Sequence, residues 1–273
     1  MNDKTREIIQ QFHTQPIRIP IDKCELEEVA ESLIELMFPI CHTPRSRNIT
    51  EELIKTGEKL HLNIKRLTNC ETADKKTELF FEKFILLQER LLEDADCYLR
   101  FDPAAKSLEE VIMAYPGFYA LCMHRIAHEL HLLDLPLFAR LFSEYAHSKV
   151  GIDIHPAAKV GKNLFMDHGT GIVIGETAVI GDNVKIYQGV TLGALYVEKK
   201  LSEVKRHPTV EDNVVIYANA TILGGSTVIG HDSTIGGGSW LTRSVIPYSV
   251  VTNSVNVKIR AGKDFSGPYD FVI

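Results

Sequence analysis

An adjacent aspartate and histidine, Asp167-His168, stand in a segment otherwise rich in isoleucine, valine and glycine, FMDHGTGIVIGE (residues 165–176). A histidine with a nearby carboxylate is the usual unit for taking a proton from a hydroxyl group, because imidazole titrates near neutral pH and the carboxylate fixes its tautomer. Asp153 lies fifteen residues before His168. The two side chains could meet across neighbouring turns of a repetitive fold or across a subunit boundary, and a structural histidine is the alternative.

Two further motifs could bind a charged ligand. Asp102 opens the segment FDPAAKSLEE, where it could hold a cation or cap a helix with Pro103 at its first position. Arg206-His207 ends a highly charged segment. Arginine can bind a carboxylate through two hydrogen bonds, and a solvated loop end is the alternative.

A metal or nucleotide site has weaker support. His124 and His128 are four residues apart and could bind a metal ion, but no HExxH accompanies them, which favours a packed helix face. The chain contains no Walker loop, no GxGxxG fingerprint and no GxSxG elbow. The sequence thus gives little support to a metal site and none to a nucleotide-binding motif.

Helices are expected to make up the first 149 residues. Residues 25–38, 79–95 and 118–133 carry apolar side chains at intervals of three and four, which is typical of amphipathic helices. Glycine is scarce there, as helix interiors require.

A six-residue repeat begins near Val150. One apolar residue recurs in each repeat and is called its leader. The leaders are Ile154, Val160, Met166, Ile174, Ile180, Ile186, Leu192, Val210, Ile216, Ile222, Ile229, Ile235 and Leu241. This period predicts a β-helix in which three hexads close one triangular coil and the leaders point inward. A sandwich of alternating strands fits the pattern much less well.

The repeat breaks in three places. Eight residues separate Met166 from Ile174, and seven separate Ile222 from Ile229. Between Leu192 and Val210 the chain reads GALYVEKKLSEVKRHPT, whose charged middle predicts a loop extruded from the β-helix.

Composition narrows the class of protein. The net charge of −6 argues against nucleic acid as the main partner. Five cysteines without a CxxC motif favour a reducing compartment, and neither a secretory signal nor a membrane-spanning run is visible. We therefore expect a cytoplasmic protein.

Taken together, the motifs resemble the serine O-acetyltransferase family. DPAAKSLEEVIMAYPGFYALCMHRIAHEL, GIDIHPAAKVGKNLFMDHGTGIVIGETAVIGDNVKIYQGVTLG and RHPTVEDNV carry the resemblance, which covers about residues 100–260. It implies an α+β chain: an all-helical domain for oligomerisation (1–149), a left-handed parallel β-helix of hexapeptide repeats (150–260) and a C-terminal tail (261–273). The handedness comes from the resemblance alone.

The resemblance also implies an activity and its residues. Acetyl would pass from acetyl-CoA, a co-substrate, to the hydroxyl of L-serine for cysteine biosynthesis, with no metal and no permanently bound cofactor. His168 would be the general base, supported by Asp153. The expected serine-binding residues are Asp102 and Asp167 for the ammonium, Arg206 and His207 for the carboxylate, and Glu176 beside them. Ala218 and Gly237 are expected at coenzyme A, although the family's GAGA is replaced here by Tyr217-Ala218-Asn219-Ala220.

Partners follow from the same resemblance. Trimers with active sites at their seams would pair into hexamers through the helical domains. L-cysteine would be a feedback inhibitor at the serine site, and Ile273 could dock in O-acetylserine sulfhydrylase, with a frayed tail as the alternative. Three rival hypotheses stay open: another hexapeptide acyltransferase, a carbonic anhydrase-like zinc site on His155, His168 and His207, and a non-catalytic scaffold.

Overall fold

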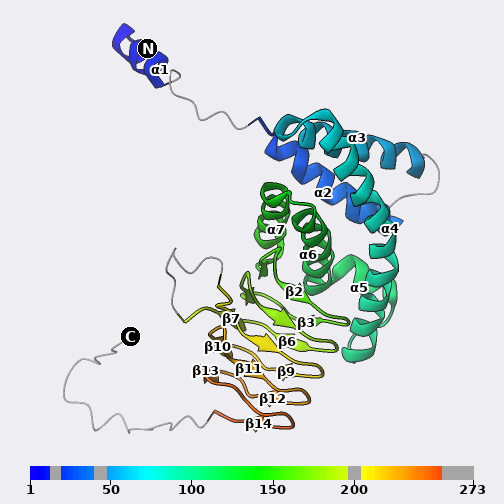
Figure 1. Ribbon diagram of the computed structural model, residues 1–273, viewed down its shortest axis with the longest axis vertical. Coiled ribbons are helices and arrows are strands. Elements are labelled where there is room, and N and C mark those ends of the chain that lie inside the picture. Colours follow the sequence, from blue (N-terminus) through cyan, green and yellow to red (C-terminus); the bar gives the residue numbers. More distant parts are fainter. Residues whose placement is uncertain (13–19, 40–47, 196–203, 254–273) are drawn as a thin grey trace.

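The computed structural model describes residues 1–12, 20–39, 48–195 and 204–253. A helical N-terminal part is followed by a stack of short strands, which Figure 1 shows below the helices. The middle of the predicted loop and the predicted contact at Ile273 lie outside the described residues.

Seven helices precede the first strand in this part of the chain. They are α1 (Asp3–Phe12), α2 (Lys23–Met37), α3 (Ile49–Leu67), α4 (Cys70–Phe101), α5 (Leu108–Ala114), α6 (Pro116–Leu132) and α7 (Pro136–Val150). Asp22, Asn48 and Asn69 cap α2, α3 and α4, each accepting a backbone N–H three residues ahead. The three helices predicted from the apolar periodicity are confirmed as α2, α4 and α6.

The strands form three parallel sheets, which are the faces of a triangular β-helix. Face 1 contains β1 (Asp153–Ile154), β4 (Val173–Ile174), β7 (Thr191–Gly193), β10 (Thr221–Leu223) and β13 (Trp240–Leu241). Face 2 contains β2 (Lys159–Val160), β5 (Val179–Ile180), β8 (Thr209–Val210) and β11 (Val228–Ile229). Face 3 contains β3 (Phe165–Asp167), β6 (Lys185–Tyr187), β9 (Val215–Ile216), β12 (Thr234–Ile235) and β14 (Val250–Val251).

The apolar leaders fill the interior of this prism. On face 1, Ile154, Ile174, Leu192 and Ile222 stack in register, and all four are buried. Such stacking removes each leader from water, at roughly 25 cal/mol per Å² of apolar surface. The predicted fold class, helices followed by a parallel β-helix of hexapeptide repeats, is confirmed.

A buried ion pair attaches the first coil of the β-helix to the helices. Arg125 of α6 donates to both carboxylate oxygens of Asp94 of α4, over 2.6 and 3.0 Å, and Asp94 is fully buried. Arg125 also donates to the carbonyl of Gly161 (2.9 Å), and the amide of Asn163 donates to Asp94 (2.9 Å). The position of the first coil is therefore fixed relative to two helices.

A second attachment lies at the start of α6. A Cβ atom on Gly117 would lie 2.2 Å from the carbonyl oxygen of Met166 in β3, so only glycine allows the helix to approach this strand. The amide of Met166 donates to the hydroxyl of Tyr98 in α4 over 3.1 Å. Backbone contacts thus hold β3, which ends at Asp167, against α4 and α6.

The expected packed helix face on α6 is confirmed. His124 is buried, and Nδ1 of His128 donates to the carbonyl of Pro156 over 2.7 Å. Among the described residues, no group of three histidine, cysteine or acidic side chains could hold a metal ion. None of the described helices combines the length and apolar character that crossing a bilayer requires.

Candidate active site

His168 projects from the corner between face 3 and face 1. Its backbone adopts the left-handed conformation (φ 57°), and its side chain is 72% exposed. Histidine visits this conformation more readily than most residues. Its Nε2 lies 3.8 Å from Oδ2 of Asp167, an ion-pair distance that is too long for a hydrogen bond. The imidazole is therefore open to a ligand.

Asp153, the expected support of His168, begins β1 on face 1. Its register partner in the next coil is Val173. No hydrogen bond or ion pair between the described side chains joins Asp153 to His168. The predicted pair is thus not made within one chain and stays a prediction.

Asp102 ends α4 instead of starting a helix. Its Oδ1 accepts the amide of Ala104 (2.8 Å), and its Oδ2 accepts the hydroxyl of Tyr115 (2.6 Å). The alternative of a helix cap with Pro103 at the first helical position is wrong, since the next helix begins only at Leu108. The carboxylate is instead held at both oxygens and remains partly exposed.

Asp102 and Asp167 occupy one neighbourhood, together with three tyrosines. Asp167 is the register partner of Tyr187. Burial, the neighbouring Tyr217 and then both carboxylates raise the pKa of Tyr187. The hydrogen bond that Tyr115 donates to Asp102, burial and, more weakly, the charge of Asp167 raise the pKa of Tyr115. Within the described chain neither carboxylate is paired with a lysine or arginine. Two such carboxylates suit a small cationic group.

Glu176, Arg206 and His207 meet at the corner between face 1 and face 2. Nη2 of Arg206 donates to Oε2 of Glu176. Burial opposes ionisation of Glu176, but the hydrogen bond from Arg206 and nearby histidines lower its pKa overall. Nδ1 of His207 accepts the amide of Thr177 (3.0 Å), so its proton sits on Nε2. Burial and then Arg206 lower the pKa of His207 to about 4. Arg206 therefore carries the positive charge of this group at neutral pH.

The residues expected to contact coenzyme A, Ala218 and Gly237, lie in later coils at the same corner of the prism as His168, between face 3 and face 1. The carbonyl of Ala218 accepts the amide of Gly238 over 2.9 Å. A Cβ atom on Gly237 would lie 3.1 Å from that carbonyl. Coils of a parallel sheet are about 4.8 Å apart, so three coils place Gly237 roughly 14 Å along the corner from His168. This corner could guide a long ligand toward the imidazole.

The predicted residues thus form two groups at different corners. Asp102, Asp167 and His168 form the acidic group. Glu176, Arg206 and His207 form the second group, which we call the cationic group after Arg206, although Glu176 balances its charge. Six residues of extended chain, one side of the prism, span up to about 20 Å. One whole face of the prism, face 1, therefore lies between the two groups of a single chain. The zinc hypothesis meets the same difficulty, because His168 lies at a different corner from His207.

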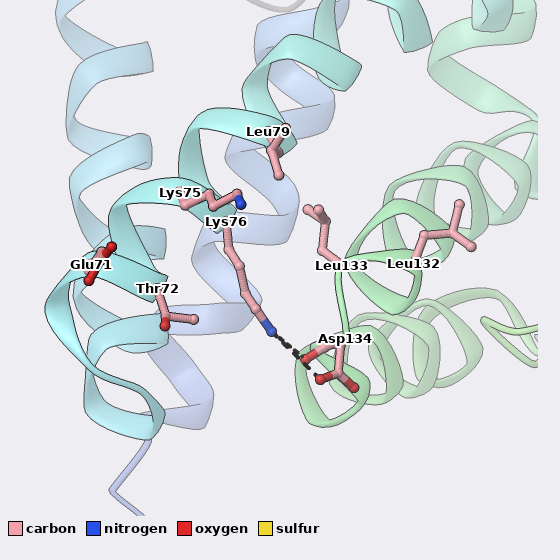
Figure 2. Close-up of a pocket in the computed structure, with 8 residues that line it drawn as sticks. All are labelled: Glu71, Thr72, Lys75, Lys76, Leu79, Leu132, Leu133 and Asp134. Atoms are coloured by element: carbon pink, nitrogen blue, oxygen red, sulfur yellow. Dashed lines mark hydrogen bonds and ion pairs between the residues drawn. The ribbon is translucent and has the colours of Figure 1, made fainter.

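A pocket of about 610 Å³ lies in the helical part, away from both groups (Figure 2). It is lined by Glu71, Thr72, Lys75, Lys76, Leu79, Leu132, Leu133 and Asp134. Nζ of Lys76 donates to the carbonyl of Asp134 over 2.9 Å and so joins α4 to the loop before α7. None of the predicted site residues lines this pocket, so it is not assigned to the site.

Sequence reasoning missed the tyrosines of the acidic group. Tyr187 and Tyr217 stack with ring centroids 5.1 Å apart. The alignment of Tyr187 with Asp167 depends on the coil that contains the first break in the repeat, and that of Tyr217 also on the length of the chain between β7 and β8. Tyr115 precedes a Pro-Gly pair, which marks a helix start and says nothing about a partner. A count of coil lengths would have revealed the first two.

Comparisons with known proteins agree with this architecture. The chain is 48% identical over 200 residues to a plasmid serine acetyltransferase of Synechococcus elongatus, covering 71% of this chain and 61% of that protein. It spans 50% and 59% of the length of two further curated relatives. No family model matches the chain.

Solved structures cover the chain more fully. Serine acetyltransferase 1 of Entamoeba histolytica, in complex with L-cysteine, is 34% identical, with a TM-score of 0.77, over 83% of this chain and 86% of that one. Serine acetyltransferase of Brucella abortus, in complex with coenzyme A, is 29% identical, with a TM-score of 0.61, over 84% and 80%. The chain therefore belongs to the serine acetyltransferase family.

Proposed function

We propose that this protein transfers the acetyl group of acetyl-CoA to the hydroxyl of L-serine. The observation that carries the proposal is the exposed imidazole of His168 beside Asp167, with Asp102 in the neighbourhood of Asp167. Neither carboxylate has a lysine or arginine partner among the described residues. A zwitterionic amino acid needs carboxylates for its ammonium, a guanidinium for its carboxylate and a base for its hydroxyl. The two groups of side chains supply these three functions.

The reaction needs no covalent enzyme intermediate. His168 takes the proton from the serine hydroxyl as that oxygen attacks the carbonyl carbon of the thioester. The tetrahedral intermediate collapses with cleavage of the C–S bond, and the departing thiolate of coenzyme A receives the proton from His168. Backbone N–H groups of the corner would stabilise the oxyanion. O-acetyl-L-serine and coenzyme A are the products, and the serine ester serves cysteine biosynthesis.

A complete site requires two copies of the chain. Because the acidic and cationic groups lie at different corners, the corner of His168 in one chain must face the corner of Arg206 in another. A trimer of β-helices provides three such seams, and Asp153 would support His168 at the seam. Helices of residues 1–149 would join two trimers into a hexamer, while residues 150–260 catalyse the reaction.

The acyl donor would follow the corner that runs from His168 to Gly237. The Brucella abortus relative binds coenzyme A, which supports Ala218 and Gly237 as contacts. The Entamoeba histolytica relative binds L-cysteine, which supports feedback inhibition by cysteine at the serine site. We also propose a cytoplasmic location and, through Ile273, a complex with the sulfhydrylase that consumes the product.

Release of free thiol from acetyl-CoA, measured with and without L-serine, tests the activity. Homoserine and amino sugars serve as competing acceptors, because an enzyme with another acceptor would prefer one of them. Thiol release that does not depend on serine contradicts the proposal.

His168→Ala should lower kcat by about 10²–10⁴-fold, the usual contribution of a general base. His231→Ala is a matched control, because His231 also lies beside an aspartate on the β-helix, with Nδ1 2.7 Å from Asp232, but away from both groups. A near-normal kcat in the His168 variant, with the oligomer intact by light scattering, would contradict general-base catalysis by His168.

A further inference from the structure

Tyr115 holds the carboxylate that the proposed function assigns to the ammonium of serine. Its hydroxyl donates to Oδ2 of Asp102 over 2.6 Å, while the amide of Ala104 donates to Oδ1 over 2.8 Å. Each carboxylate oxygen has more than one acceptor site. With one site occupied on both oxygens, the carboxylate cannot rotate freely, and its remaining sites keep a fixed direction.

Tyr115 is itself held in place. It ends α5 and directly precedes Pro116, the first residue of α6. Its ring packs edge-on against Tyr98 at 6.1 Å, and the hydroxyl of Tyr98 accepts the amide of Met166, the residue before Asp167. The same tyrosine cluster therefore fixes Asp102 on α4 and the end of β3 that carries Asp167.

We propose that Tyr115 is a positioning residue of the amino-acid subsite, orienting Asp102 so that it and Asp167 face one ammonium group. This inference rests on the proposed function and extends it by one residue. The phenol is a reliable donor, because its hydrogen bond to Asp102, burial and the nearby carboxylates all raise its pKa. It therefore keeps its proton at neutral pH, where the carboxylates are ionised.

Tyr115→Phe removes only the hydroxyl and keeps the ring that packs against Tyr98. We expect the KM for L-serine to rise roughly tenfold, the factor that corresponds to one lost hydrogen bond of about average strength. The kcat and the KM for acetyl-CoA should change less than about twofold. Tyr119→Phe is the matched control: it removes a hydroxyl on the next turn of α6, bonded to Glu31 over 3.0 Å, and should leave both KM values unchanged.

A double-mutant cycle separates positioning from a general loss of structure. If Tyr115 acts through Asp102, then Tyr115→Phe should have no further effect on kcat/KM for serine in an Asp102→Asn background. Additive effects, an unchanged KM in Tyr115→Phe, or a change shared by Tyr119→Phe would each overturn the inference.

Calorimetric binding of L-serine, without acetyl-CoA, distinguishes a wrong role for Tyr115 from a wrong proposed function. If the wild type acetylates serine but Tyr115→Phe binds serine as tightly as the wild type, only the role of Tyr115 is wrong. If the wild type neither binds nor acetylates serine, the proposed function itself fails. A roughly tenfold weaker binding of serine to Tyr115→Phe supports both the role of Tyr115 and the proposed function.

Discussion

Adding a single methyl group at Gly117 should separate α6 from the β-helix. The new Cβ atom would lie 2.2 Å from the carbonyl oxygen of Met166 and 3.0 Å from the hydroxyl of Tyr98. Because a backbone oxygen cannot rotate away, the helix must shift by about 1 Å. Overpacking of this kind costs typically 1–3 kcal/mol and sometimes more, against a gain of up to about 1 kcal/mol from replacing glycine in a helix. Because the clash is with a backbone atom at 2.2 Å, the cost falls at the upper end of that range, about 3 kcal/mol. We expect Gly117→Ala to lose a net of about 2 kcal/mol of stability.

Gly57→Ala provides the matched control. Gly57 also lies in a helix, α3, but its Cβ atom would meet only the ring of Phe81, at 3.3 Å, and a ring can give way. This variant should be unchanged or more stable by up to about 1 kcal/mol.

Thermal unfolding followed by circular dichroism measures both variants. A loss of 2 kcal/mol corresponds to a fall in Tm of roughly 4–8 °C for a domain of about this size. The KM for serine should also rise in Gly117→Ala, because Tyr115 moves with the start of α6. A Tm at or above the wild-type value, or equal shifts in the two alanine variants, would show that the approach of α6 to β3 does not depend on glycine.

Two further outcomes follow from buried ionisable groups. Asp94→Asn leaves the guanidinium of Arg125 buried without its counter-charge and should cost about 3–5 kcal/mol in urea unfolding; a loss under about 1 kcal/mol would contradict the role of this pair. The pKa of His207 in the folded chain is about 4, below the value of about 6.5 in unfolded chains. As the pH falls, the unfolded state therefore binds a proton on His207 before the folded state does. His207 has no such effect on the free energy of unfolding above pH 6.5 and lowers it by up to about 3 kcal/mol near pH 4. Urea midpoints at pH 7 and pH 5 should differ less in His207→Gln than in the wild type, and an identical difference in both would refute the assignment.

The β-helix was predictable because its stabilising contacts repeat. Each leader such as Ile174 or Ile216 packs on the same position of the adjacent coil, so a local pattern of six residues carries the whole interior. The breaks in the period were equally informative. The first coincides with the corner of His168, where Gly169 and Gly171 also have positive φ, and the third falls between β7 and β8.

The arrangement of the site was less predictable, because it depends on contacts between distant elements. Asp102 was weighed as a helix cap on the strength of the following proline, yet its partner Tyr115 comes from another helix junction. The assignment of each site residue to a corner required the coil lengths, which the interruption between β7 and β8 changes. The family motifs identified candidate residues but could not show that they divide into two groups.

The triangular coils contact only their neighbours, so the two ends of the β-helix are unequally anchored. The first coil is attached to α4 and α6, whereas the last described coil exposes Trp240, Tyr248 and Val250. In such linear stacks, opening spreads from the weakest terminus. Warming should therefore fray the coil of Gly237 before that of His168. Under the proposed function, contacts with acetyl-CoA would be lost at a lower temperature than contacts with serine.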